Sequence, residues 1–123
     1  MAIERRDTFR VRPTSREPIR VEIVGSGMLE VGEVVDISEG GVGVHLEGVT
    51  GADFAGQELE FLIAFPGSHA VYVRGIVRTV RVENGCVLGV QFVNLPAKAL
   101  DAIRGYVSGR GRRHSSNFRV SGG

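Results

Sequence analysis

The chain has 123 residues, 15 of them basic and 14 acidic, and a single cysteine, Cys86. This length fits one domain with a modest core, and one cysteine excludes both an intrachain disulfide and a thiolate metal cluster. No apolar run reaches the roughly 18 residues of a membrane span, and the start lacks the apolar stretch of a signal peptide. We therefore expect a cytoplasmic protein without membrane insertion.

The basic residues are unevenly distributed. Fourteen of the fifteen are arginines, and eleven of those lie in residues 1–20 or 104–123. Arginine suits planar, bidentate recognition of anionic groups, although a GC-rich genome produces the same preference over lysine. Both explanations stay open at this stage.

Residues 1–17 are predicted to form a flexible, Arg-rich arm. Charges of mixed sign, with Pro13 and then Pro18, disfavour a stable helix or strand. Arg5, Arg6 and Arg10 place three guanidinium groups within six residues. The alternatives are a solvated tail and an arm that an anionic ligand orders.

Residues 19–24 alternate apolar and charged side chains, which predicts a half-buried strand, and residues 28–37 are predicted to form a second strand. Side chains alternate between the faces of a strand, so Asp36 and Ser38 share one face. The glycines that follow, Gly40 and Gly41, allow a tight turn and close approach to the backbone.

Residues 42–46 are predicted to form the next strand, with its valines and leucine toward the core. On its other face Gly41 and Gly43 leave a flat, bare surface beside Ser38. Such a surface can receive a planar base, although glycines there also allow a sheet to twist.

Three further strands are predicted over residues 57–65, 69–83 and 86–93. The alternation of the second slips near Thr79, which indicates a β-bulge, and Asn84-Gly85 predicts a hairpin. The second strand also carries outward-facing arginines that are either ligand contacts or solvated charges: Arg74, Arg78 and Arg81.

A helix is predicted from Pro96 to Gly109, because apolar residues recur there at i, i+3, i+4 and i+7. Residues 109–123 have the composition of a disordered basic tail. The expected fold is mainly β. Residues 18–108 would form a small six-stranded antiparallel β-barrel, or a sharply twisted sheet, with one C-terminal α-helix covering an opening.

Arginines next to a small acceptor pair suit a ligand that is both anionic and a hydrogen-bond donor. A guanine nucleotide has both properties. Its O6/N7 edge and its phosphates accept hydrogen bonds from arginine, while its N1–H and N2–H₂ groups can donate to Asp36 and Ser38.

Two motifs carry a family resemblance. The segment Arg5-Arg6 to Arg10 has the pattern RRxxxR, and Asp36 to Gly41 has the pattern DxSxxG. The spacing RxxxR also occurs at Arg12/Arg16 and Arg16/Arg20, but only Arg6/Arg10 has a doubled first position and an apolar frame. In this order, ahead of a glycine- and valine-rich strand, the two motifs resemble those of the PilZ domain. The resemblance covers about residues 4–107.

The PilZ family consists of bacterial receptors for cyclic di-GMP, so the resemblance implies a six-stranded barrel that binds this ligand. The motif residues would hold it: Arg5, Arg6, Arg10, Asp36, Ser38 and Gly41. An arginine at the place of Arg5 is associated in the family with an intercalated ligand dimer, which implies two cyclic di-GMP molecules per chain.

The leading hypothesis is therefore a receptor or adaptor that orders its N-terminal arm on binding cyclic di-GMP and signals to a partner protein. A barrel binding single-stranded nucleic acid and a PilZ-like adaptor without ligand are the alternatives. Phosphate-binding loops, nucleophile elbows and metal-ligand spacings of histidine are absent from the sequence. We therefore expect no enzyme activity, no metal and no cofactor.

Overall fold

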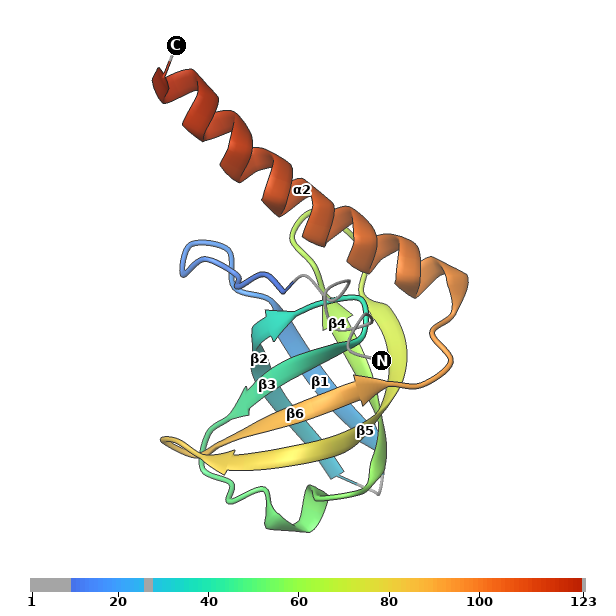
Figure 1. Cartoon of the computed structure of the whole chain (residues 1–123). Coiled ribbons are helices and arrows are strands. Elements are labelled where there is room, and N and C mark those ends of the chain that lie inside the picture. Colours follow the sequence, from blue (N-terminus) through green and yellow to red (C-terminus); the bar gives the residue numbers. More distant parts are fainter. Residues whose placement is uncertain (1–9, 26–27, 123) are drawn as a thin grey trace, which may run out of the picture.

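The computed structural model describes residues 10–25 and 28–122, and of Gly25, Met28 and residues 110–122 only the backbone. Six strands precede one long helix, α2, and a single-turn 3₁₀ helix, η1, interrupts them (Figure 1). In chain order the elements are β1 (Arg20–Gly25), β2 (Met28–Ile37), β3 (Gly41–Leu46), η1 (Ala52–Phe54), β4 (Glu58–Ala64), β5 (Val71–Val82), β6 (Cys86–Phe92) and α2 (Ala97–Gly122).

The strands close into a barrel in the order β1-β2-β3-β6-β5-β4, with every neighbouring pair antiparallel. The predicted six-stranded antiparallel β-barrel with one C-terminal helix is thus confirmed. Alternate residues of each strand face the interior, and Phe61 is the largest side chain that is fully buried there. Apolar alternation along short strands produces this arrangement, because it gives each strand one face for the core.

Two β-bulges interrupt the regular pairing. Val34 pairs with Val44 and Asp36 with Gly43, so Val35 is an extra residue in β2. Likewise Val77 pairs with Val90 and Thr79 with Gly89, which makes Arg78 an extra residue in β5. The second bulge confirms the slip predicted near Thr79, whereas the first was not anticipated from the sequence.

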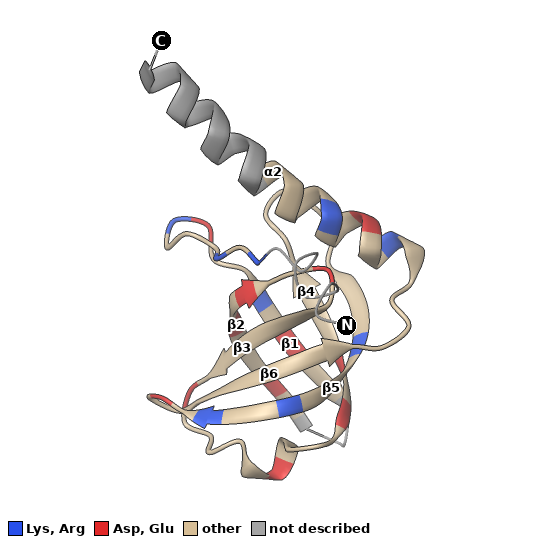
Figure 2. Cartoon of the chain, viewed as in Figure 1, with Lys and Arg blue, Asp and Glu red and all other residues tan. Residues whose placement is uncertain are grey.

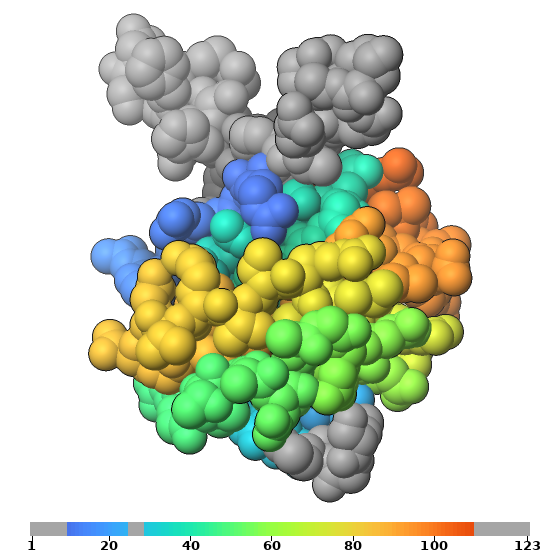
Figure 3. All heavy atoms as spheres, turned by 60° about the horizontal axis from the view of Figure 1, so that its bottom comes forward, coloured from blue at the N-terminus to red at the C-terminus, as the bar shows by residue number. Residues whose placement is uncertain are grey.

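Each end of the barrel is covered by a separate element (Figure 1). At one end Ala99, Ile103 and Val107 of α2 are buried in the core cluster, and Tyr106 lies 5.2 Å from the Phe65 ring. At the other end Phe54 of η1 is buried. Figure 3 shows the segment around η1, in green, lying against the yellow atoms of β5 and the adjoining hairpin.

Cys86 lies close to the η1 end of the barrel and is fully buried. Burial, with a smaller effect from Glu30, raises the pKa of its thiol. A protonated, inaccessible thiol is unreactive, so Cys86 packs as a small hydrophobic residue.

Two boundaries differ from the sequence prediction. The helix was expected to end at Gly109, with a disordered tail over 109–123, but α2 continues to Gly122. A glycine inside a helix costs only about 1 kcal/mol relative to alanine, so it does not by itself end one.

None of the helices among the described residues is long and apolar enough to cross a membrane.

The second difference concerns the arm predicted over residues 1–17. Val11 is buried, and its backbone N–H and C=O both pair with Ile37 at 3.0 and 2.9 Å. The chain is therefore fixed to the end of β2 from Arg10 onward. Residues 1–9 lie outside the described residues.

The β5–β6 hairpin has the predicted turn, with positive φ at Asn84 and at Gly85. A Cβ atom at Gly85 would lie 2.1 Å from the carbonyl oxygen of Leu46. Gly67 also has positive φ, but a Cβ there would meet no atom within 4 Å. A substitution at Gly67 therefore tests backbone strain alone, and one at Gly85 tests strain together with steric overlap.

We predict that Gly85→Ala lowers the free energy of unfolding by about 2–5 kcal/mol, because left-handed strain adds to overlap with fixed backbone. Gly67→Ala, with strain alone, should cost about 1–2 kcal/mol. Urea denaturation followed by circular dichroism measures both values. Equal losses in the two variants would contradict the role assigned to the Leu46 carbonyl.

Candidate ligand-binding site

The described residues of the two sequence motifs meet where β2 ends. Nη2 of Arg10 lies 2.8 Å from Oδ1 of Asp36, and Nη1 donates to Oγ of Ser38 at 3.3 Å. Backbone hydrogen bonds between Val11 and Ile37 hold this geometry, because they place Arg10 beside Asp36 and Ser38. One guanidinium group thus spans both acceptors of the DxSxxG motif.

Asp36 reaches the outer face only because of the bulge at Val35. Val34 is buried, so in a regular strand Asp36 would point inward as well. The extra residue reverses the alternation, which buries Ile37 and turns Asp36 outward, where its side chain is 27% exposed.

Ser38 is a fully buried polar residue at the start of the turn. Its hydroxyl oxygen accepts hydrogen bonds from Arg10 and from the backbone N–H of Gly40 at 3.2 Å. Its own N–H donates to the carbonyl oxygen of Gly41 at 2.9 Å. Ser38 therefore fixes both the turn and the guanidinium group of Arg10.

Glycines form the surface between this motif and β5. Strand pairing places Asp36, Gly43, Gly89 and Thr79 in one row across β2, β3, β6 and β5. A Cβ at Gly43 would lie 2.8 Å from Oδ1 of Asp36, and one at Gly89 would lie 2.2 Å from Oγ1 of Thr79. The absence of both methyl groups leaves a flat surface bordered by a carboxylate and a hydroxyl.

Gly41 has a second reason to be glycine. A Cβ there would lie 2.2 Å from the carbonyl oxygen of Val90 on β6. Strand packing thus requires a glycine as the last residue of the DxSxxG motif, whatever the pocket binds.

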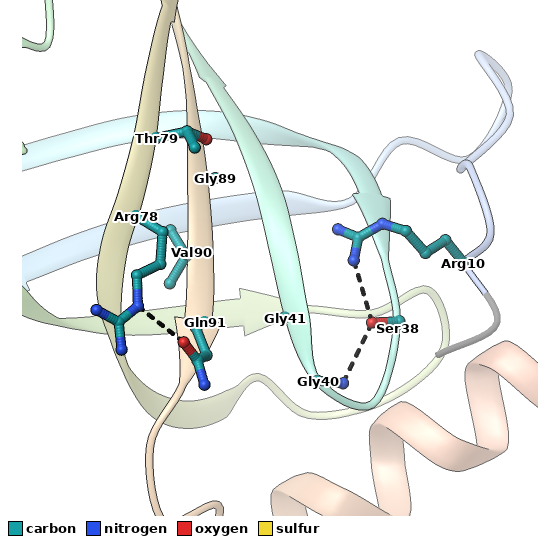
Figure 4. A pocket seen from close by; sticks show the side chains of 9 residues that line it. All are labelled: Arg10, Ser38, Gly40, Gly41, Arg78, Thr79, Gly89, Val90 and Gln91. Atoms are coloured by element: carbon teal, nitrogen blue, oxygen red, sulfur yellow. Dashed lines mark hydrogen bonds between the residues drawn. The ribbon is translucent and has the colours of Figure 1, made fainter. Parts of the chain in front are cut away.

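A pocket of about 360 Å³ lies over this surface (Figure 4). Arg10 and Ser38 border it on one side, and Arg78 and Gln91 on the other, with Gly41 and Gly89 between them. Nε of Arg78 donates to Oε1 of Gln91 at 2.8 Å, which fixes the guanidinium group at that rim. The pocket therefore has a cationic group on each of two opposite sides.

Four of the six predicted site residues lie within the described part of the chain. The structure brings together Arg10, Asp36, Ser38 and Gly41, whereas Arg5 and Arg6 lie outside the described residues. Of the three strand arginines left open, Arg78 lines the pocket. Arg74 pairs with Glu58, and Arg81 pairs with Glu83.

Sequence reasoning missed Gly89, Thr79 and Gln91 as parts of the same surface. A glycine inside the apolar run 86–93 was the available indication, since glycine in a strand often marks close approach. Among the described residues, no group of three or more His, Cys, Asp or Glu side chains is placed to hold a metal ion.

Comparison with known proteins gives a family for the chain. The family model of the PilZ domain matches residues 4–109. No curated protein matches the chain.

Several solved structures share the fold. The structure of YcgR from Escherichia coli in complex with c-di-GMP has a TM-score of 0.75 at 13% identity, covering 95% of this chain and 50% of YcgR. The PilZ domain of YcgR with c-di-GMP has a TM-score of 0.70 at 16% identity, covering 92% of this chain and 98% of that domain. The K. pneumonia MrkH–c-di-GMP complex has a TM-score of 0.76 at 14% identity, covering 88% of this chain and 53% of MrkH.

The chain thus spans about half the length of YcgR and of MrkH but nearly all of the isolated YcgR domain. The family model covers most of the chain, including both motifs, and the barrel has the fold of these structures. The chain therefore belongs to the PilZ domain family.

Proposed function

We propose that this protein is a receptor for cyclic di-GMP that acts by binding and not by catalysis. The observation that carries the proposal is that Arg10 and Ser38 border a pocket lined by glycines, with Asp36 bound to the guanidinium group of Arg10. The similar structures of YcgR and MrkH were determined with c-di-GMP bound. Motif, geometry and structural relatives support the same ligand.

Each part of the site matches one part of the ligand. Phosphate oxygens and the O6/N7 edge of guanine accept hydrogen bonds from guanidinium groups, which Arg10 supplies and Arg5 and Arg6 would add. The N1–H and N2–H₂ groups of guanine donate to carboxylate oxygens such as those of Asp36. Ser38, which is buried and already accepts two hydrogen bonds, holds Arg10 in place. A flat surface at Gly43 and Gly89 gives a purine ring room to lie against the sheet.

The free energy of these contacts is large enough for cyclic di-GMP to bind. Hydrogen bonds to charged groups contribute about 1.5–3 kcal/mol each, so four or five of them offset the cost of ordering a short arm and leave about micromolar binding. Because Arg10 is already held by Asp36, the ordering would be confined to residues before it. An ordered arm would then present a new surface to a partner protein, in the cytoplasm.

Titration calorimetry tests the proposal directly. We expect cyclic di-GMP to bind, and GTP and a single-stranded DNA oligonucleotide to bind at least tenfold more weakly. Asp36→Ala should weaken cyclic di-GMP binding about tenfold or more, because it removes a charged acceptor. Asp53→Ala, at an exposed acid of η1 at the other end of the barrel, is the matched control. Absence of binding to the unmodified protein, or an Asp36→Ala affinity within threefold of it, would refute the assignment.

Arg78 should contribute a contact that the family motifs do not include. We expect Arg78→Ala to weaken cyclic di-GMP binding fivefold or more, since it removes a cation from the pocket rim. Arg81→Ala is the control, because Arg81 lies on the same strand but pairs with Glu83 and does not line the pocket. Equal effects of the two substitutions would show that only the net charge of β5 matters.

The number of ligands depends on Arg5. Two stacked cyclic di-GMP molecules bring four phosphate charges together, and a third guanidinium group offsets part of their repulsion and can lie against a purine face. We predict two ligands per chain, falling toward one in Arg5→Ala without loss of binding. Calorimetry at protein concentrations well above the dissociation constant counts them. One ligand per unmodified chain would refute this prediction and leave the choice of ligand intact.

A further inference from the structure

Exposed apolar side chains gather on the barrel wall opposite the pocket. Four large hydrophobic residues stand out as exposed among those described: Leu29 at 68%, Val31 at 49%, Tyr72 at 43% and Val82 at 80%. The first three lie on the outward faces of β2 and β5 within one patch, whereas Val82 ends β5 beside the β5–β6 hairpin.

Strand register joins these residues into a continuous surface. Val31 is paired with Glu22, Glu22 with Leu62, and Leu62 with Tyr72, in one row across β2, β1, β4 and β5. In the adjacent row Leu29 is paired with Val24. At about 4.8 Å between strands, the row extends for roughly 14 Å. We call this surface the outer patch: Glu22, Val24, Leu29, Val31, Leu62 and Tyr72.

The outer patch is distinct from the ligand site. The closed strand order puts β1 and β4 on the far side of the ring from β3 and β6. The outer patch is centred on the first pair, and the pocket lies over the second. A molecule on the patch and a ligand in the pocket can therefore be bound at once.

The charge of the outer patch selects its partner. Glu22, half-buried between Val31 and Leu62, has no salt-bridge partner within the part of the chain that is described. Around it Arg74 pairs with Glu58, and the remaining carboxylates of Glu33 and Glu60 outnumber the guanidinium group of Arg20. Figure 2 shows the acidic residues of β1 and β2 in red. A carboxylate flanked by apolar side chains is partly desolvated, so a cation brought to it interacts more strongly than in open water.

Three other occupants are disfavoured by the same charges. A second copy bound face to face about a twofold axis would bring Glu22 toward Glu22. Nucleic acid and anionic membrane surfaces would meet a negative face. Apolar side chains with an excess of carboxylates around them instead complement a segment that is apolar at its centre and basic around it.

We propose that the outer patch docks a basic, apolar-faced segment of a partner protein, with a Lys or Arg placed against Glu22 and apolar side chains covering Leu29, Val31 and Tyr72. The proposal does not depend on the identity of the pocket ligand. Its affinity would come from apolar area and its selectivity from the carboxylates.

The test uses the full chain and two synthetic 16-residue helical peptides. The first has leucines at i, i+3, i+4 and i+7 with arginines flanking them, and the second replaces every arginine with glutamate. We expect the arginine peptide to shift amide NMR signals of β1, β2 and β4, leaving those of β3 and β6 unchanged. The glutamate peptide should bind at least tenfold more weakly.

Matched variants locate the contact. Leu29→Ser should weaken binding of the arginine peptide fivefold or more and Glu22→Gln threefold or more. Val82→Ser, at a more exposed apolar residue outside the patch, and Asp53→Asn, at a distant acid, should change it less than twofold. No binding at millimolar peptide, equal binding of the two peptides, shifts centred on β3 and β6, or equal losses in patch and control variants would each overturn the proposal.

Discussion

Closure of the barrel fixes the register of every strand, and the candidate site depends on the two places where that register is offset. A strand that is paired on both sides cannot slide, so an extra residue must be accommodated locally as a bulge. At Val35 the bulge turns Asp36 out of the core, and at Arg78 it places a guanidinium group at the pocket rim. The site therefore lies between two bulges, on strands whose own pairing, β3 with β6, is regular.

Packing restricts the same glycines that form the surface of the candidate site. Gly43 and Gly89 are direct partners in the row that joins Asp36 to Thr79, and either methyl group would strike a polar side chain that borders the surface. Substitution of Gly41 is restricted more strongly, because an added Cβ would overlap the backbone of Val90, which cannot move aside as a side chain can. A substitution at Gly41 would therefore disturb the fold before it reported on a ligand, which makes Asp36 and Arg78 the better probes of binding.

Much of the fold followed from local sequence patterns. Short apolar patterns located the strands before Asn84, Asn84-Gly85 located the hairpin and with it β6, and the slip in apolar phase revealed the bulge of β5. The bulge at Val35 was missed because Val34 and Val35 are both apolar and fit either phase. Gln91 and Arg78 were not recognised as neighbours since their contact depends on pairing between strands. The helix end was wrong because a glycine penalty of about 1 kcal/mol is too small to set a boundary.

The turn of the DxSxxG motif is also where the site meets the rest of the chain. The Gly40 carbonyl accepts from the N–H of Phe92 at 3.0 Å, at the end of β6, and Glu39 lies 3.2 Å from Nε of Arg104 on α2. The ion pair is half-exposed and contributes less than about 1 kcal/mol, so the backbone bond is the firmer connection. Both lead from Ser38 toward α2, whereas the outer patch lies on the opposite wall. Under the proposed function, a partner that responds to the ligand would bind near Ser38, and one that binds the outer patch would stay attached with or without the ligand.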